Sequence, residues 1–287
     1  MTVMPEAQTN QPDTAESFER RFGGLRRLYG VDGAQRIFNA HVVVVGIGGV
    51  GSWSVEALAR SGVGRLTLID LDHVSESNIN RQIHALEPTL GQSKAEAMRE
   101  RIALFHPACM VDVIDDFVTP DNWPDVLDAA LGPGVPTPSA LIDACDQVRA
   151  KTVLAAWAAS NGVHFVVVGA AGGKRRAQAV EVEDLADVTH DPLLAQLRYR
   201  LRKQHSGART GRMQVACVFS REAVAPPDAS CVIDNVDSSL NCHGYGSVVS
   251  VTATFGLCAA GWVLNTLATS KKSASASKKR GESDAII

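Results

Sequence analysis

The stretch His41-Val-Val-Val-Val-Gly-Ile-Gly-Gly-Val-Gly-Ser-Trp-Ser54 decides the fold. Its β-branched run, Val42 to Val45, is typical of a short buried strand. Glycines in Gly-x-Gly-x-x-Gly spacing follow, and Ser52–Arg60 then has the pattern of a helix. A strand, a glycine turn and a helix in this order are typical of the first half of a nucleotide-binding βαβ unit. The glycines of the turn are Gly46, Gly48, Gly49 and Gly51.

The second strand of this unit is expected at Arg65–Asp70 and ends in a carboxylate. Asp70 lies about 20 residues after the last glycine, where an acidic side chain can accept the ribose hydroxyls of a nucleotide. The glycines let a phosphate approach the backbone, and the helix start offers unpaired N–H groups. A glycine turn that serves packing alone is the alternative, which the flanking strands and the acid disfavour.

The polar residues after this strand indicate which nucleotide is expected. An arginine offers a planar fork of donors and a lysine offers a point charge, and both suit a triphosphate. A pyrophosphate cradled by backbone N–H groups needs neither, so the pattern favours ATP. The alternatives are a non-catalytic NAD-type binding module and a solvated polar loop. The residues concerned are Asp72, Asn80, Arg81, Gln82 and Lys94.

The motifs G-I-G-G-V-G-S, I-D-L-D-H-V and S-N-I-N-R-Q, with Lys94 downstream, resemble the adenylating domain of the ubiquitin-activating superfamily, the ThiF/MoeB group. Further motifs resemble a narrower family within it, the tRNA threonylcarbamoyladenosine dehydratases, and the resemblance runs from about Phe18 to Leu267. These motifs lie at Arg21–Gly30, Asn80–Leu86, Asp115–Asn122 and Val251–Gly256.

This resemblance implies an α/β fold with a Rossmann-like, mostly parallel sheet and flanking helices. We expect a disordered tail over residues 1–17, an ATP-binding adenylation domain over 18–269, and a disordered basic tail over 270–287. The implied reaction is ATP-dependent dehydration of N6-threonylcarbamoyladenosine in tRNA through an acyl-adenylate. The alternative substrate is the C-terminal glycine of a ubiquitin-like sulfur-carrier protein.

Two acids at the end of the strand Ala140–Asp143 are candidates for a magnesium site. By resemblance they lie near the ATP phosphates, and Mg²⁺ takes oxygen ligands from protein and phosphate together. Asp146 is the first choice of ligand and Asp143 the second. The alternative for Asp146 is the N-cap of the helix expected at Gln147–Asn161.

Two further residues are candidates by resemblance alone. In related homodimers an N-terminal arginine reaches the ATP phosphates of the partner, and Arg21 is the candidate here. Some relatives carry an acyl group on a cysteine, which makes Cys242 a candidate nucleophile beside His243. The alternatives are a surface arginine and a buried cysteine that serves as a small hydrophobe.

A net charge of −3 argues against a wholly basic nucleic-acid-binding protein, so a tRNA contact is expected in a local patch. Residues 174–212 contain that patch, and no acid lies between Arg198 and Arg212. Such density favours contacts to the phosphate backbone, with a solvated charge run as the alternative. The candidates are Lys174, Arg175, Arg198, Arg202, Lys203, Arg209 and Arg212.

The six cysteines include no Cys-x-x-Cys pair, so we expect no structural zinc and no disulfide framework. The polar start, Met1–Glu16, is unlike a signal peptide, which favours a cytoplasmic protein. Residues 247–269 carry no charge; we expect a helix packed on the domain, with membrane association as the alternative. A sulfur-transfer partner, such as a cysteine desulfurase system, remains open.

Overall fold

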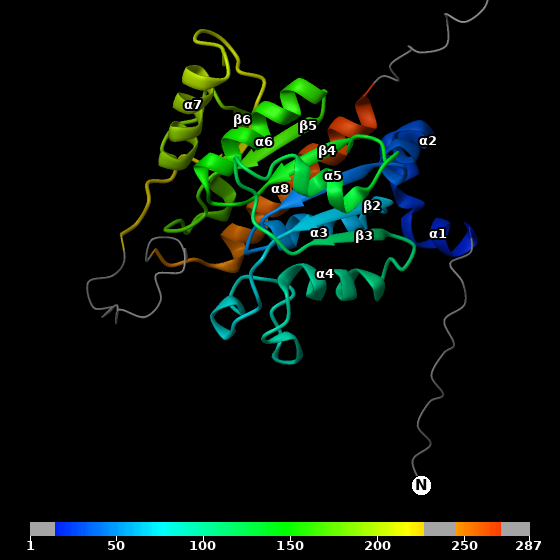
Figure 1. Cartoon of the computed structure of the whole chain (residues 1–287). Helices are drawn as coiled ribbons and strands as arrows, with labels where there is room; N and C mark the ends of the chain where they lie inside the picture. Colours follow the sequence, from blue (N-terminus) through cyan, green and yellow to red (C-terminus); the bar gives the residue numbers. More distant parts are fainter. Residues whose placement is uncertain (1–14, 227–244, 271–287) are drawn as a thin grey trace, which may run out of the picture.

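The computed structural model describes residues 15–226 and 245–270, and within them seven strands form one sheet flanked by helices (Figure 1). The strand order is β3-β2-β1-β4-β5-β7-β6, and every neighbouring pair is parallel except β6 with β7. The strands are β1 His41–Val45, β2 Arg65–Ile69, β3 Met110–Ile114, β4 Ala140–Asp143, β5 His164–Val168, β6 Val180–Asp184 and β7 Ala216–Ser220.

The helices cover both faces of this sheet, as the βαβ pattern predicts. They are α1 Ala15–Phe22, α2 Gly24–Phe38, α3 Gly51–Arg60, α4 Lys94–Ala103, α5 Asp125–Leu131, α6 Val148–Asn161, α7 Pro192–Gln204 and α8 Val249–Thr269. Short 3-10 turns lie at η1 Glu76–Asn78, η2 Glu87–Thr89 and η3 Ala177–Ala179. The prediction of an α/β, Rossmann-like fold is confirmed.

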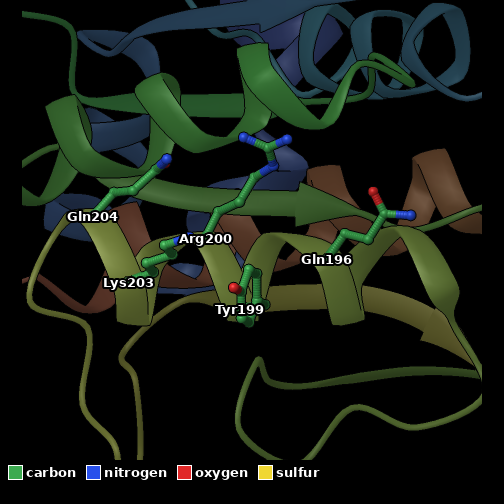
Figure 2. Close-up of a pocket in the computed structure, with 5 residues that line it drawn as sticks. All are labelled: Gln196, Tyr199, Arg200, Lys203 and Gln204. Carbon is green, nitrogen blue, oxygen red and sulfur yellow. The ribbon is translucent and has the colours of Figure 1, made fainter.

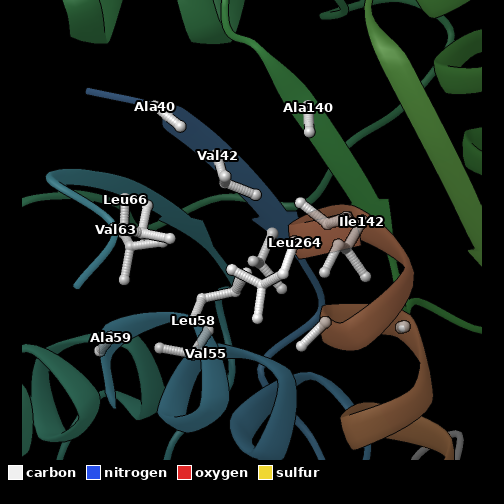
Figure 3. Packing of buried hydrophobic residues seen from close by; sticks show 14 of the residues in the cluster. Ala40, Val42, Val55, Leu58, Ala59, Val63, Leu66, Ala140, Ile142 and Leu264 are labelled. Carbon is white, nitrogen blue, oxygen red and sulfur yellow. The ribbon is translucent and has the colours of Figure 1, made fainter. Parts of the chain in front are cut away.

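The valines of β1 are buried on both faces of the sheet because successive side chains of a strand point in opposite directions. Val42 belongs to a core with Leu58 of α3 and Leu264 of α8 (Figure 3). Val43 belongs to a second core beneath α5, α6 and α7, which includes Leu154. Both cores therefore hold β1 and β4 at the centre of the molecule.

The order of the strands reverses between β1 and β4, since β2 and β3 lie on one side of β1 and β5 and β7 on the other. In such sheets a crevice opens at the carboxyl ends of the two central strands, where ligands bind. The glycine turn follows β1 there, and Ala144 and Cys145 follow β4. The fold therefore brings the glycine turn and the acids at the end of β4 to one edge.

The charge-free helix α8 is long and apolar enough to span a membrane by length and composition, yet 56% of its most apolar window is buried within the structure. Val251, Phe255 and Val263 of α8 all lie in the core with α3. A Cβ atom built at Gly256 would lie 2.3 Å from the Val50 carbonyl oxygen, so the two backbones are in close contact. As the sequence predicts, this helix packs on the domain.

Some elements differ from the sequence-based expectations. The Pro- and Gly-rich composition of Leu127–Ser139 predicts a surface loop, but α5 extends to Leu131 because Leu127 is buried. Helix α1 begins at Ala15, inside the predicted tail of residues 1–17, because Phe18 and Phe22 pack their rings together. The expected tail 270–287 lies outside the described residues, apart from Ser270.

Candidate functional site

The glycine turn is built by close contact between backbones. Gly46 has a φ of +85°, and a Cβ atom there would lie 2.8 Å from the Cys145 nitrogen. A Cβ atom at Gly51 would lie 1.8 Å from the Gly46 carbonyl oxygen. Packing therefore requires glycine at both positions. At Gly48 the nearest atom is Nε2 of Gln82, 4.0 Å away, so this position faces open space where a ligand can approach the backbone.

The Asp70 carboxylate joins the end of β2 to the glycine turn. Its Oδ2 accepts the Ile47 N–H, and its Oδ1 accepts the Asp72 N–H at 2.8 Å. Burial raises the pKa of Asp70, although the Lys94 ammonium and the two backbone donors oppose the rise. A carboxylate has about four acceptor sites, so this one can still accept a hydroxyl from a ribose.

Lys94 stands at the start of α4 and points back to the loop after β2. Its Nζ lies 2.7 Å from Asp72 Oδ2, and only 6% of the residue is exposed. Buried His84 has its pKa lowered to about 3 by burial and by the positive charges of Lys94 and Arg101. The imidazole is therefore neutral, and the cationic character of this region comes from Lys94 and Arg101.

Arg81 lies across the glycine turn. Its Cγ and Cδ would be 3.2 and 3.3 Å from a Cβ atom at Gly49, and its backbone carbonyl accepts a hydrogen bond of 3.0 Å from Trp53 Nε1. Its Nη1 donates to Asn80 Oδ1 at 2.8 Å. The aliphatic part of the Arg81 side chain therefore packs along the glycine turn, and Trp53 of α3 holds the Arg81 backbone.

The neighbours of Arg81 complete this loop. Asn80 Nδ2 donates to the Ser247 carbonyl at 3.1 Å, which ties the loop to the start of α8. Gln82 is 5% exposed, and its Oε1 is a buried acceptor with no partner within the described residues. Buried acceptors are rarely left unpaired, so Gln82 is placed to receive a donor from a bound ligand.

The two acids at the end of β4, Asp143 within the strand and Asp146 after it, have different surroundings. Asp143 is fully buried, and its Oδ1 accepts Lys151 Nζ at 3.1 Å and Cys145 Sγ at 3.0 Å. Burial raises the pKa of Cys145 well above its ordinary value, as does the Asp143 charge, so the thiol stays protonated and donates. Asp146 is exposed, and Gln147 holds the N-cap position of α6.

Asp146 is therefore better placed than Asp143 to hold Mg²⁺. Across residues 15–226 and 245–270, no group of three or more His, Cys, Asp or Glu side chains is placed to hold a metal. Mg²⁺ does not need such a group, because it commonly binds one or two carboxylates together with substrate phosphates. Asp146 is an exposed carboxylate that directly follows Cys145, whose backbone nitrogen lies against Gly46, and this position fits such a mode of binding.

A family model described as the ThiF family matches residues 21–281. The chain belongs to the ThiF family. It is 43% identical over 254 residues to a protein named tRNA threonylcarbamoyladenosine dehydratase from Escherichia coli (strain K12), covering 85% of this chain and 92% of that one.

Two solved structures of the E. coli dehydratase are similar to this ThiF-family chain. One, a complex with ATP, has a TM-score of 0.77 at 42% identity and covers 88% of this chain and 96% of that chain. The other, a complex with AMP, has a TM-score of 0.76 at 42% identity and covers 90% and 98%. The likeness extends over nearly the whole described fold.

Arg21, the predicted ATP-binding residue from a partner subunit, lies far from the crevice of its own ThiF domain. Helix α1 packs Phe22 against His106, with ring centroids 4.6 Å apart, and His106 precedes β3. This contact places α1 at the amino ends of the strands, the edge opposite the glycine turn. Arg21 therefore lies away from the crevice of its own chain, and its role at the ATP site of a partner subunit stays a prediction. Cys242 lies outside the described residues.

The basic residues of 174–212 divide into two groups. The side chains of the first group form hydrogen bonds within the protein. Lys174 is 2% exposed, and its Nζ donates to the Ser220 and Glu222 carbonyls at 3.0 and 2.8 Å. Burial lowers the pKa of this ammonium. The prediction that Lys174 contacts RNA therefore needs correction, since its charge lies inside the domain.

Two arginines of α7 belong to the same group. Arg198 Nη1 donates to the Leu185 and Val188 carbonyls, and Arg202 Nε donates to the Ala208 carbonyl. They share a helix face, as their spacing predicts, but that face is turned towards the protein backbone. The second group is exposed and consists of Arg175, Lys203, Arg209 and Arg212.

Several residues that shape the site escaped the sequence analysis. Trp53 lies in the helix that the sequence predicts at Ser52–Arg60, but the helical pattern does not indicate its hydrogen bond to the Arg81 carbonyl. Lys151 lies within an apolar helix, and a lysine at such a position signals a buried partner. Tyr199 is 62% exposed on α7. In the sequence it is one aromatic residue within a run of basic residues, and this pattern alone does not predict a function for it.

Proposed function

We propose that this chain catalyses the ATP-dependent dehydration of N6-threonylcarbamoyladenosine in tRNA through an acyl-adenylate. The observation that carries this proposal is the contact of Arg81 and Asp70 with the glycine turn, with Lys94 paired to Asp72 on the adjoining loop, in a chain 43% identical to a dehydratase of that name. The likeness to structures that hold ATP and AMP supports a reaction that converts one into the other.

The reaction has two steps in this proposal. The threonyl carboxylate attacks the α-phosphorus of ATP, the bond between the α- and β-phosphates breaks, and pyrophosphate leaves. A nitrogen of the same carbamoyl unit then attacks the acyl carbon and loses its proton to solvent. The ring closes and AMP leaves with one carboxylate oxygen. Since that oxygen departs on AMP, the tRNA loses the elements of water.

Each residue of the site has a role in this scheme. The backbone of Gly46, Gly48 and Gly49 runs beside the nucleotide, and Asp70 accepts the ribose hydroxyls. Arg81 and Lys94 stabilise the negative charge that develops on the phosphates, which is commonly the largest single contribution to such catalysis. In this scheme Asp72 holds the Lys94 ammonium, and Asn80 and Gln82 orient the Arg81 loop.

Magnesium is part of this proposal, with Asp146 as its ligand; when bound, the ion neutralises charge on the phosphates. Replacing Asp146 by asparagine is expected to raise the Mg²⁺ concentration for half-maximal ATP–pyrophosphate exchange by about tenfold, equivalent to roughly 1.4 kcal/mol. Exchange assays over a Mg²⁺ titration measure this shift. An unchanged Mg²⁺ dependence of Asp146→Asn would remove this residue from the site.

The open space at Gly48 gives a second test of the nucleotide site. Gly48→Ala is expected to weaken ATP binding by about tenfold or more, because its methyl group occupies the path of the phosphates. Its melting temperature is expected to stay unchanged, since no protein atom lies within contact distance. Gly51→Ala is the matched comparison and is expected to lower the melting temperature. Calorimetry with ATP tests both variants, and wild-type affinity in Gly48→Ala would contradict the predicted path.

We also propose that the protein is a cytoplasmic homodimer and that Arg21 of one subunit contacts the ATP bound to the partner subunit.

The direct test of the function is mass spectrometry of tRNA nucleosides after incubation of the purified chain with ATP and modified tRNA. A cyclic product lighter by one water is expected. Pyrophosphate exchange that responds to a ubiquitin-like carrier protein, and is indifferent to tRNA, would instead identify a sulfur-carrier activator.

A further inference from the structure

The outer face of α7 is both basic and aromatic. The inner face buries Leu194, Leu197 and Leu201 in the core, in the spacing of an amphipathic helix. Other side chains of α7 surround a concavity of about 300 Å³, and Figure 2 shows them on successive turns of the helix, with Arg200 and Gln204 extending towards the neighbouring helix. These side chains are Gln196, Tyr199, Arg200, Lys203 and Gln204.

The charges on this face are available to a ligand. Arg198 and Arg202 are hydrogen-bonded to backbone carbonyls, whereas Arg200 and Lys203 border the concavity. Neither Arg200 nor Lys203 has an ion-pair partner within the part of the chain that the structure describes. Lys203 is exposed and Arg200 is half-buried at the rim of the same concavity, and two such cations favour an anionic partner with spaced charges, such as a nucleic-acid backbone.

Tyr199 adds a feature that phosphate binding alone does not need. Its side chain is exposed on α7, and Lys203 Nζ lies 5.7 Å from the ring centroid. This cation–π contact holds the ring beside the ammonium group. Proteins bind single-stranded RNA by stacking splayed bases on aromatic rings and pairing their edges with amide and guanidinium groups. Gln196 and Gln204 supply such amides at the same concavity.

The face lies within reach of the crevice. Asp191, the N-cap of α7, accepts the N–H groups of Leu194 and Ala170, and Ala170 lies just beyond β5. Helix α7 therefore begins at the carboxyl edge of the sheet, the same edge that carries the glycine turn. Tyr199 follows eight residues after Asp191, which corresponds to about 12 Å along the helix. An RNA loop that enters the crevice at this edge therefore approaches the start of α7.

We propose that this face of α7 is a nucleotide subsite for the tRNA substrate. Tyr199 stacks on an unpaired base, Gln196 and Gln204 contact its edge, and Arg200 and Lys203 bind the adjoining phosphates. The inference rests on the function proposed above and deepens it, because it locates where RNA outside the reacting adenosine binds. An acidic protein segment is the other class of partner that such a face could accept.

The test separates stacking from charge by fluorescence anisotropy with a labelled tRNA stem-loop over a salt titration. Tyr199→Ala is expected to weaken binding on the order of tenfold at every salt concentration, because no charge is lost. Tyr199→Phe, which keeps the ring, is expected to bind like the wild type. Arg200→Ala and Lys203→Ala are each expected to lower the slope of log affinity against log salt by about 0.7 to 1.

Arg27→Ala, which removes an exposed arginine from α2, is the control and is expected to change neither affinity nor slope. Steady-state AMP release completes the test. Tyr199→Ala is expected to raise KM for tRNA and to leave kcat unchanged, because the reacting groups are untouched. Wild-type KM and affinity in Tyr199→Ala would overturn the subsite, whereas failure of the wild-type chain to act on tRNA would overturn the proposed function itself. Binding of an acidic peptide but not RNA by this face would also overturn the subsite.

Discussion

Replacing Lys94 by alanine is expected to lower kcat for AMP formation by about 10²- to 10³-fold, the loss typical for removal of one preorganised donor to developing charge. The ammonium is almost wholly buried beside Asp72, so it needs little reorganisation before it acts on a phosphate. Quench-flow or steady-state assays of AMP release at saturating ATP and tRNA measure the effect.

The fold is expected to tolerate this change. Asp72 is 55% exposed, and buried Asp70 keeps its hydrogen bonds from the Ile47 and Asp72 N–H groups when Lys94 is removed. Asp72→Asn is the matched control, since it removes the partner and keeps the ammonium, and its kcat is expected to fall less than that of Lys94→Ala. A Lys94→Ala enzyme with a kcat within about threefold of wild type would show that the charge is not used in catalysis.

Replacing Lys151 by methionine is expected to lower the free energy of unfolding by about 3–5 kcal/mol, because it leaves Asp143 as an unpaired charge in the core. Both side chains are fully buried, and Lys151 Nζ also donates to the Val168 carbonyl at 2.9 Å. Burial alone would lower the pKa of Lys151, but Asp143 and Cys145 more than compensate and raise it, so the ammonium stays protonated. Urea denaturation measures the loss.

The double variant Asp143→Asn with Lys151→Met separates the pair from its packing. It removes both charges, so it is expected to recover much of the stability lost in the single variant. A single Lys151→Met variant as stable as wild type would contradict the buried ion pair. Because the pair joins the end of β4 to α6, the single variant is also expected to disturb the turn that carries Asp146.

The sequence predicts the parts of this molecule that depend on local pattern. The valine run of β1, the glycine spacing and the acid after β2 lie within one short stretch, and the structure has them as predicted. Helix α2 was missed because its glycines obscure the pattern; Gly30 has a φ of +74° and kinks it. The local sequence pattern of α2 is therefore too weak to predict this helix, which tertiary packing stabilises.

Side-chain orientation was harder to predict than charge. The density of basic residues along the sequence predicts one patch that contains Lys174, Arg198 and Lys203. Of these three residues, only Lys203 points to solvent. The long-range partners that hold the other two, at Ser220 and Leu185, are set by the antiparallel β6–β7 edge and the loops around it. No spacing rule within one helix contains that information.

The most direct test of the central claim follows the oxygen that leaves the substrate. The chain is incubated with ATP and with tRNA whose threonylcarbamoyl carboxylate carries ¹⁸O, and the nucleotide product is analysed by mass spectrometry. Attack of the carboxylate on the α-phosphate predicts AMP that has gained one ¹⁸O atom, with the cyclic nucleoside formed in equal amount. ADP as the product, or AMP without the label, would contradict an acyl-adenylate made at this glycine turn.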